Sequence, residues 1–287
     1  MKGEAKGEAT SAAQRDAKAV NGEVLLSVQG VSLKLGGNLI LNQLAFDVVD
    51  RIRPGTTTGQ LVGLLGPSGV GKTRLIRLIA GLDQPDAGTI AGKAGAPLLA
   101  GRVGVVFQDY ALLRHRTAED NLIVAGVMNG LSGAESTGRA RELLDKFRLG
   151  DRGAFYPAQL SGGQRQRVAI AQQLVVPKSL LLMDEPFSGL DPVALDEVVR
   201  LIVEVTHLDE LNTVVIVTHD VHSALLIADT VLMLGRDHDA EGRPIPGARI
   251  QQSYDMVERG LCWRQDLDSD PAFNALYQEI RERFRGL

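Results

Sequence analysis

The chain has 287 residues, of which 44% are hydrophobic and 23% are charged, an ordinary balance for a globular protein with a substantial core. A formal net charge of −4 offers no basic surface to nucleic acid, so we expect no nucleic-acid partner. The single cysteine, Cys262, excludes an internal disulfide framework, suits the cytoplasm and is expected to be buried. No apolar run approaches the roughly 18 residues that a membrane span needs.

The first segment, residues 1–22, is rich in Lys, Glu, Ala and Gly and lacks the apolar stretch of a signal peptide, so we expect a disordered tail. Partly alternating apolar residues then favour short strands over Val24–Gln29, Val31–Leu35 and Leu39–Val49. The polar, turn-rich residues 50–59 predict a connection to the next strand.

A glycine-rich loop follows the apolar strand Gln60–Leu65 and precedes a helix that starts near Arg74. Its spacing, G-x-x-x-x-G-K-[ST] between a strand and a helix, is that of a phosphate-binding loop. The loop consists of Gly66, Pro67, Ser68, Gly69, Val70, Gly71, Lys72 and Thr73. Its glycines let backbone N–H groups face a phosphate at the helix N-terminus. Lys72 can then reach the β- and γ-phosphates, and the Thr73 hydroxyl can ligate Mg²⁺.

Helical periodicity replaces the strand pattern between about residues 109 and 160, and it predicts an inserted helical subdomain. Thr117 and Asp120 form a candidate capping box for one helix, and residues 135–147 favour a second. A short apolar strand over residues 102–107 precedes this insert and ends at Gln108.

Strands and helices alternate again after Leu160, which predicts an α/β fold with a mainly parallel sheet covered by helices. The expected helices are 163–175, 193–208 and 220–228, and the expected strands are 179–183, 213–218 and 230–234. A surface loop is expected over 236–247, followed by a last helix that Asp270 caps and whose apolar stripe docks on the core. The stripe comprises Phe273, Leu276, Tyr277, Ile280 and Phe284.

Three further groups fit phosphate chemistry. Asp184 and Glu185 end an apolar strand, where an Asp of P-loop nucleotidases helps to hold Mg²⁺ and a neighbouring carboxylate can polarise the attacking water. Ser161-Gly162-Gly163 opens a helix and offers a hydroxyl and N–H groups to a second phosphate. His219 ends another strand, where it can contact the γ-phosphate.

In this order and spacing the motifs resemble those of the ABC-type ATPases, over residues 23–235. The string Leu-Ser-Gly-Gly-Gln at 160–164 is the most specific of them. The resemblance implies a P-loop core with an antiparallel β portion and an inserted helical subdomain, with residues 236–287 as a C-terminal extension. It also implies hydrolysis of ATP with Mg²⁺.

The same resemblance implies that two ATPase subunits sandwich two ATP molecules head to tail. Ser161 and Gly163 would then contact the ATP that the second subunit holds. The implied catalytic residues are Glu185, His219 and Gln108, and the implied metal ligands are Thr73, Gln108 and Asp184. Leu35 departs from the pattern, since the family often has an aromatic residue there that stacks on adenine, and leucine offers only apolar packing.

A chain of this kind needs separate membrane permease subunits, which the resemblance places at the helical subdomain. Residues 110–113 either receive a permease helix or belong to the core. The C-terminal extension loosely resembles the nitrate, sulfonate and taurine importer ATPases, so we expect a subunit of a bacterial small-anion importer on the inner face of the membrane, with a solute-binding protein as a further partner. The alternatives are an exporter or cell-envelope ATPase and a soluble regulatory ABC ATPase.

Overall fold

The computed structural model describes residues 20–52, 59–176, 178–206, 213–262, 264 and 266–287. Most of the expected N-terminal tail therefore lies outside the described residues. Its last residues, 20–22, belong to the first strand, so the strand begins earlier than the alternation of apolar residues suggested. In the part of the chain that is described, no helix combines the length and the apolar character of a membrane span.

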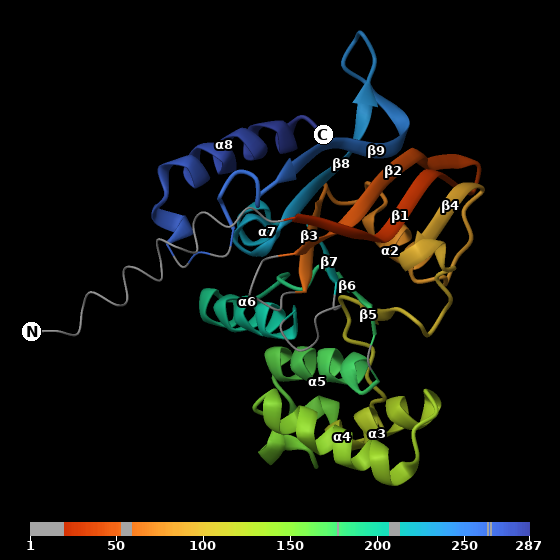
Figure 1. Cartoon of the computed structure of the whole chain (residues 1–287), viewed down its shortest axis with the longest axis vertical. Coiled ribbons are helices and arrows are strands. Elements are labelled where there is room, and N and C mark those ends of the chain that lie inside the picture. The colour runs from red at the N-terminus through yellow and green to blue at the C-terminus, as the bar shows by residue number, and fades with distance from the viewer. Residues whose placement is uncertain (1–19, 53–58, 177, 207–212, 263, 265) are drawn as a thin grey trace, which may run out of the picture.

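One sheet of nine strands runs through the described residues, in the order β4-β1-β2-β9-β8-β3-β7-β6-β5 (Figure 1). The strands are β1 (Val20–Leu35), β2 (Asn38–Ile52), β3 (Gln60–Leu65), β4 (Ala87–Gly92), β5 (Gly104–Val106), β6 (Leu180–Asp184), β7 (Thr213–Thr218), β8 (Thr230–His238) and β9 (Pro244–Asp255). Strands β8, β3, β7, β6 and β5 are parallel neighbours, whereas β1 pairs antiparallel with both β2 and β4. The mainly parallel core and the antiparallel portion are thus parts of a single sheet.

Helices cover both faces of this sheet. They are α2 (Lys72–Ile79), α3 (Ala118–Met128), α4 (Gly133–Lys146), α5 (Gly162–Leu174), α6 (Pro192–Thr206), α7 (Val221–Ile227) and α8 (Pro271–Arg285), with short 3-10 turns at Lys93–Gly95, Gly150–Arg152, Pro157–Gln159 and Leu267–Ser269. Successive residues of the wholly buried strand β3 face opposite sides, so Leu61 belongs to the core cluster of helices α3 to α8 and Val62 to the cluster of α2 and the antiparallel strands. This double burial explains why β3 is apolar throughout.

The predicted helical insert contains α3 and α4, which lie with α5 in a lobe beyond the β5 edge of the sheet (Figure 1). The capping box of Thr117 and Asp120 is present: the Thr117 hydroxyl accepts the Asp120 N–H at 3.1 Å, and Asp120 accepts the Thr117 N–H. Ser132 and Glu135 form the same box at the start of α4. Each cap satisfies backbone donors that the first turn of a helix leaves open.

Several predicted boundaries were wrong. The strands expected at 24–29 and 31–35 form one strand, because a bulge near Gly30, at φ +63°, absorbs the break without ending the pairing with β2. Residues 50–52 continue β2 rather than starting a connection, since Arg51 pairs with Asn21. Strand β4 was not predicted, because it is short and glycine-rich, and it is a strand through its antiparallel pairing with β1.

The segment 236–247, expected as a surface loop, belongs largely to the antiparallel hairpin of β8 and β9. Its charges pair across the hairpin: the Arg249 guanidinium donates to both carboxylate oxygens of Asp237, at 2.8 and 2.9 Å. Only a tight turn at 239–243, with Gly242 at φ +77°, remains outside the ladder. Polar composition marked these residues as exposed, but exposure does not exclude strand pairing.

The last helix agrees with the prediction. The Asp270 carboxylate accepts the backbone N–H groups of Ala272 and Phe273, and proline stands at the first helical position. Phe273, Leu276 and Ile280 are buried in the core, with Tyr277 and Phe284 partly buried against it. Cys262 is buried as expected.

Candidate nucleotide site

Three neighbouring parallel strands bring the predicted phosphate-binding groups together. The register pairs Leu65 at the end of β3 with Thr218 at the end of β7, and Asp184 at the end of β6 with Val217. The chain therefore leaves all three strands at one edge of the sheet. Ligand sites of open α/β sheets lie at this edge.

The predicted phosphate-binding loop, residues 66–73, leaves β3 and enters α2. Gly69 and Gly71 have φ of +78° and +115°, a conformation that side chains with a Cβ resist. A Cβ on Gly66 would lie 2.8 Å from the Leu234 carbonyl oxygen, so only glycine fits there. The Lys72 ammonium lies inside the loop, donating to the carbonyls of Gly66 at 2.7 Å and Pro67 at 3.1 Å.

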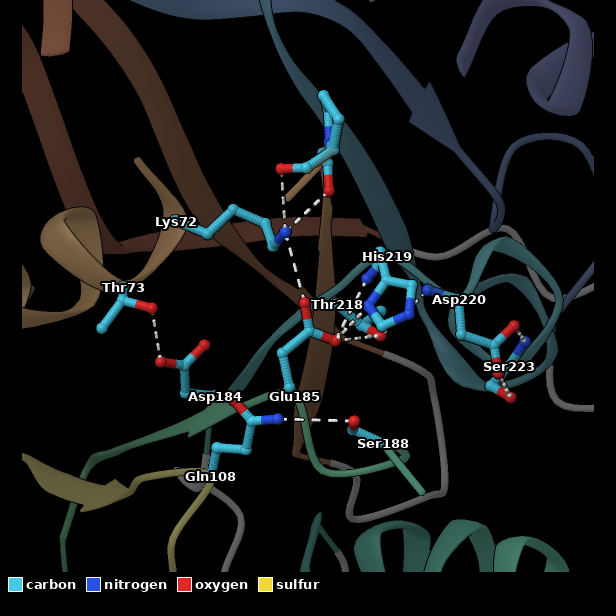
Figure 2. A network of polar contacts seen from close by, with 12 residues as sticks. Lys72, Thr73, Gln108, Asp184, Glu185, Ser188, Thr218, His219, Asp220 and Ser223 are labelled. Carbon is cyan, nitrogen blue, oxygen red and sulfur yellow. Dashed lines mark hydrogen bonds and ion pairs between the residues drawn. The ribbon is translucent and has the colours of Figure 1, made fainter. Parts of the chain in front are cut away.

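Glu185 connects this loop to β7 (Figure 2). One of its carboxylate oxygens is 3.2 Å from the Lys72 ammonium. The other accepts the Thr218 hydroxyl at 3.1 Å and the His219 backbone N–H at 3.2 Å, and lies 2.8 Å from His219 Nδ1. The backbone of Glu185 has φ +51°, fixed by its N–H bond to the Val217 carbonyl at 2.7 Å. An uncommon backbone conformation thus aims this carboxylate at the loop.

Asp184 faces the start of α2 rather than Lys72. Its Oδ2 accepts the Thr73 hydroxyl at 2.7 Å, while its buried Oδ1 has no hydrogen-bond partner among the described residues. Burial raises the pKa of Asp184, and the Glu185 carboxylate adds to this, although the Thr73 bond and the Lys72 charge oppose it. A buried carboxylate oxygen without a partner, beside a hydroxyl, suits a small hard cation.

Gln108 comes from the chain just after β5 and joins the same cluster (Figure 2). Its amide nitrogen lies 3.4 Å from the Ser188 hydroxyl, in the segment that follows Glu185. The structure therefore brings together Lys72, Thr73, Gln108, Asp184, Glu185 and His219.

The remaining predicted residues lie elsewhere. Ser161 is exposed at the start of α5, where its hydroxyl accepts the Gln164 N–H at 3.2 Å in a third capping box, and Gly163 follows in the first turn. Figure 1 shows α5 with the helical lobe, well separated from α2. Leu35 ends β1 beside the Gly36-Gly37 turn with 37% of its surface exposed. Of the residues at 110–113, Leu112 packs partly against the core and Leu113 is exposed.

Sequence reasoning missed Gln166, which is completely buried and donates to the Pro186 carbonyl at 2.8 Å. This bond ties α5 to the loop that follows Glu185. The polar run 164–167 gave no sign that one member is buried, because helix packing alone decides which side of α5 faces inward.

Comparison with known proteins agrees with this geometry. Residues 49–188 match the family described as ABC transporter. A sulfate/thiosulfate import ATP-binding protein CysA from Gloeobacter violaceus is 40% identical over 248 residues, which cover 84% of this chain and 70% of the relative. The chain belongs to the ABC transporter ATP-binding family. A CysA protein from Thermosynechococcus vestitus is 39% identical over 215 residues, 74% of this chain and 61% of the relative.

The described fold is that of an ABC ATPase, as predicted. A solved ATP-binding subunit of an ABC transporter superposes with a TM-score of 0.64 at 25% identity, covering 88% of this chain and 99% of that one. The cbiO1 structure from Clostridium perfringens gives a TM-score of 0.68 at 24% identity and covers 83% of this chain and 91% of that one. The chain spans 61% and 70% of the two CysA relatives, whose names specify sulfate and thiosulfate rather than nitrate, sulfonate or taurine.

Proposed function

We propose that this protein is the ATP-hydrolysing subunit of a bacterial small-anion importer and powers transport through a separate membrane permease. The observation that carries the proposal is the convergence of Lys72, Glu185 and His219 on one point at the carboxyl edge of the sheet. Phosphoryl transfer needs positioning and fixed positive charge more than covalent chemistry. The loop amides and Lys72 supply the charge, and Glu185 supplies the base.

The contacts of Glu185 suggest how the base works. In the described structure its carboxylate is shared between Lys72 on one side and Thr218 with His219 on the other. A γ-phosphate attracts the Lys72 ammonium more strongly than one carboxylate does, because it carries more charge and more acceptor oxygens. Glu185 is then released on that side while Thr218 and His219 keep holding it, with one oxygen free to accept a proton from water.

The residues present also fit Mg²⁺. Thr73 and Asp184 would hold it, with Gln108 as a further ligand from the same cluster. Mg²⁺ typically takes one or two protein oxygens and fills its other positions with phosphate oxygens and water. When bound, it would neutralise the charge that develops on the phosphoryl oxygens.

A second ATPase subunit would complete the site. Ser161 is exposed, and its hydroxyl oxygen only accepts within its own cap, so its O–H group remains to donate to a ligand. Together with the N–H groups of the first turn, including that of Gly163, it offers a set of hydrogen-bond donors to an anion. A head-to-tail pair would supply one in each interface, and this supports the sandwich arrangement.

The solute is proposed from the relatives. The CysA proteins are named for sulfate and thiosulfate, and the C-terminal resemblance pointed to nitrate, sulfonates or taurine. All of these solutes carry an oxygen-rich anionic group, so we propose a small anion of this kind. The permease and a solute-binding protein would carry the solute across the membrane, and the ATPase would sit on the inner face of the membrane.

The test is a pull-down of the tagged protein from detergent-solubilised membranes, combined with Mg²⁺-dependent phosphate release by the purified complex. We expect a multi-span permease to co-purify and its solute-binding protein, loaded with sulfate or thiosulfate, to stimulate hydrolysis. Activity that stays entirely in the soluble fraction with no membrane partner would replace the transporter with a regulatory ABC ATPase. Absence of ATP hydrolysis in every fraction would overturn the enzymatic assignment.

A further inference from the structure

A groove of about 340 Å³ lies between α7 and α8, outside the nucleotide site. Helix α8 packs on α7 through its apolar stripe, and the groove opens along the edge of that contact. Its lining residues are His219, Asp220, Val221, His222, Tyr277, Arg281, Phe284 and Arg285. Nothing in the proposed hydrolysis uses the four residues that α8 contributes.

Two arginines give the groove its charge. Arg281 and Arg285 stand one helical turn apart on α8, so they project from the same side. Neither forms an ion pair with any residue that the structure describes, whereas Arg283 on the same helix is 3.1 Å from Glu279. Like charges at this spacing repel each other, and Glu282, which lies between them in the sequence, is not among the residues that line the groove. A bound anion would relieve that repulsion.

The rest of the lining suits an anion as well. The Tyr277 hydroxyl forms no hydrogen bond within the described residues and is available as a donor, while its ring packs edge-on against His222 with centroids 5.5 Å apart. His222 is itself held by Asp268 at 2.9 Å. Asp220 lines the groove too, but its carboxylate is already occupied by α7: the His222 N–H donates at 3.1 Å and the Ser223 hydroxyl at 2.5 Å.

The groove adjoins the catalytic end of the nucleotide site. A second hollow of about 320 Å³ is lined by Phe187, Ser188, Gly189, Thr218, His219 and Asp220, so His219 and Asp220 belong to both hollows. Figure 2 shows that His219 lies between Glu185 and Asp220. An anion in the groove would therefore lie close to His219, the residue that is proposed to steady the γ-phosphate.

We propose that the α7–α8 groove binds a tetrahedral oxyanion, held by the guanidinium groups of Arg281 and Arg285 and by the Tyr277 hydroxyl. Arginine forks match phosphate and sulfate oxygens in charge and geometry. The anion is either phosphate, the product of hydrolysis, or sulfate of the transported class, and in both cases its binding slows turnover. This inference rests on the proposed function for the origin of the anion, but not for the existence of the site.

The experiment measures binding of inorganic phosphate and of sulfate to the full chain by calorimetry, with saturating ADP to fill the phosphate-binding loop. The test variant is R281Q/R285Q, which removes two cations that make no ion pair, and the matched control is R283Q on the same helix. Y277F removes only the hydroxyl. We expect one anion per chain for the native protein and R283Q, at least tenfold weaker binding for the double variant, and an intermediate loss for Y277F.

The relative affinity for the two anions distinguishes the two sources of the ligand, hydrolysis and transport. Tighter binding of phosphate, with Arg-dependent inhibition of hydrolysis by added phosphate, assigns the groove to product release. Tighter binding of sulfate, with inhibition by sulfate, assigns it to feedback by the solute. Equal binding of both anions by the native protein and by R281Q/R285Q, with both proteins folded by thermal melt, would overturn the site. Anion binding is measured without turnover. An inactive ATPase would therefore contradict the proposed function, but the binding data would still test the groove.

Discussion

The two proposed phosphate-binding elements of this chain differ in how completely the chain itself surrounds them. In the loop 66–73, Lys72 is only 6% exposed and is surrounded by two carbonyls and a carboxylate. At the start of α5, Ser161 is exposed, and within the described residues its hydroxyl contacts only Gln164. The first element is assembled from three strands of its own chain, and the second from one local cap. From this difference we expect the first element to bind a nucleotide within one chain, and the second to contribute only when a second subunit brings its nucleotide.

The largest expected effect tests the completed element. Glu185→Gln should lower the rate of ATP hydrolysis by roughly 10²–10⁴-fold, because the base is lost while the amide still fits beside Thr218 and His219. ATP binding should persist, and gel filtration with ATP should show a dimer. Glu197→Gln, at an exposed position of α6, is the control. A variant that hydrolyses ATP at the native rate would remove Glu185 from its role.

Lys72→Ala should weaken ATP binding by roughly ten- to a hundredfold, since it removes a charge-assisted contact of about 1.5–3 kcal/mol. The measurement is equilibrium binding of a fluorescent ATP analogue. Arg74→Ala, two residues along the same helix and exposed, should bind ATP normally. Equal affinities for the two variants would mean that the loop does not recognise phosphate through its lysine.

Ser161→Ala tests the incomplete element. Loss of the cap should cost about 1 kcal/mol of stability. Hydrolysis should fall roughly tenfold, because a donor to the second ATP is missing, while ATP binding to dilute protein stays unchanged. Ser132→Ala removes an identical capping box from α4 and should cost the same stability without lowering hydrolysis. If both variants behave alike, Ser161 is only a cap.

The smallest effect concerns the pH dependence of stability. Burial raises the pKa of Asp184, so the folded state holds this proton more tightly than the unfolded chain, and stability falls as pH rises from the unfolded pKa through the folded one. Without Mg²⁺, Asp184→Asn should therefore melt at a higher temperature than the native protein near pH 8, and the gap should shrink in acid. The exposed Asp196→Asn on α6 should show no such trend. A gap that widens in acid would contradict the sign.

Features that depend on residues within one or two helical turns of each other were predictable from the sequence. The capping box of Thr117 and Asp120 and the N-cap of Asp270 depend on hydrogen bonds over two or three positions, and the structure contains both. The loop between β3 and α2 was predictable for the same reason, since its spacing and flanking periodicity are local. The roles of the site residues remain proposals, although their positions are now described.

The sequence by itself determined the order of the helices and of the strands other than β4 and β9, several helix caps and the chemical types at the strand ends. Only the tertiary structure decided that the charged residues at 236–247 pair in a hairpin, that Gln166 is buried, and that Arg281 and Arg285 line a groove beside His219. Local structure is encoded in neighbouring residues, whereas these features depend on contacts between segments far apart in the chain. Their register is set by packing of the whole sheet and its helices, and no window of sequence contains that information.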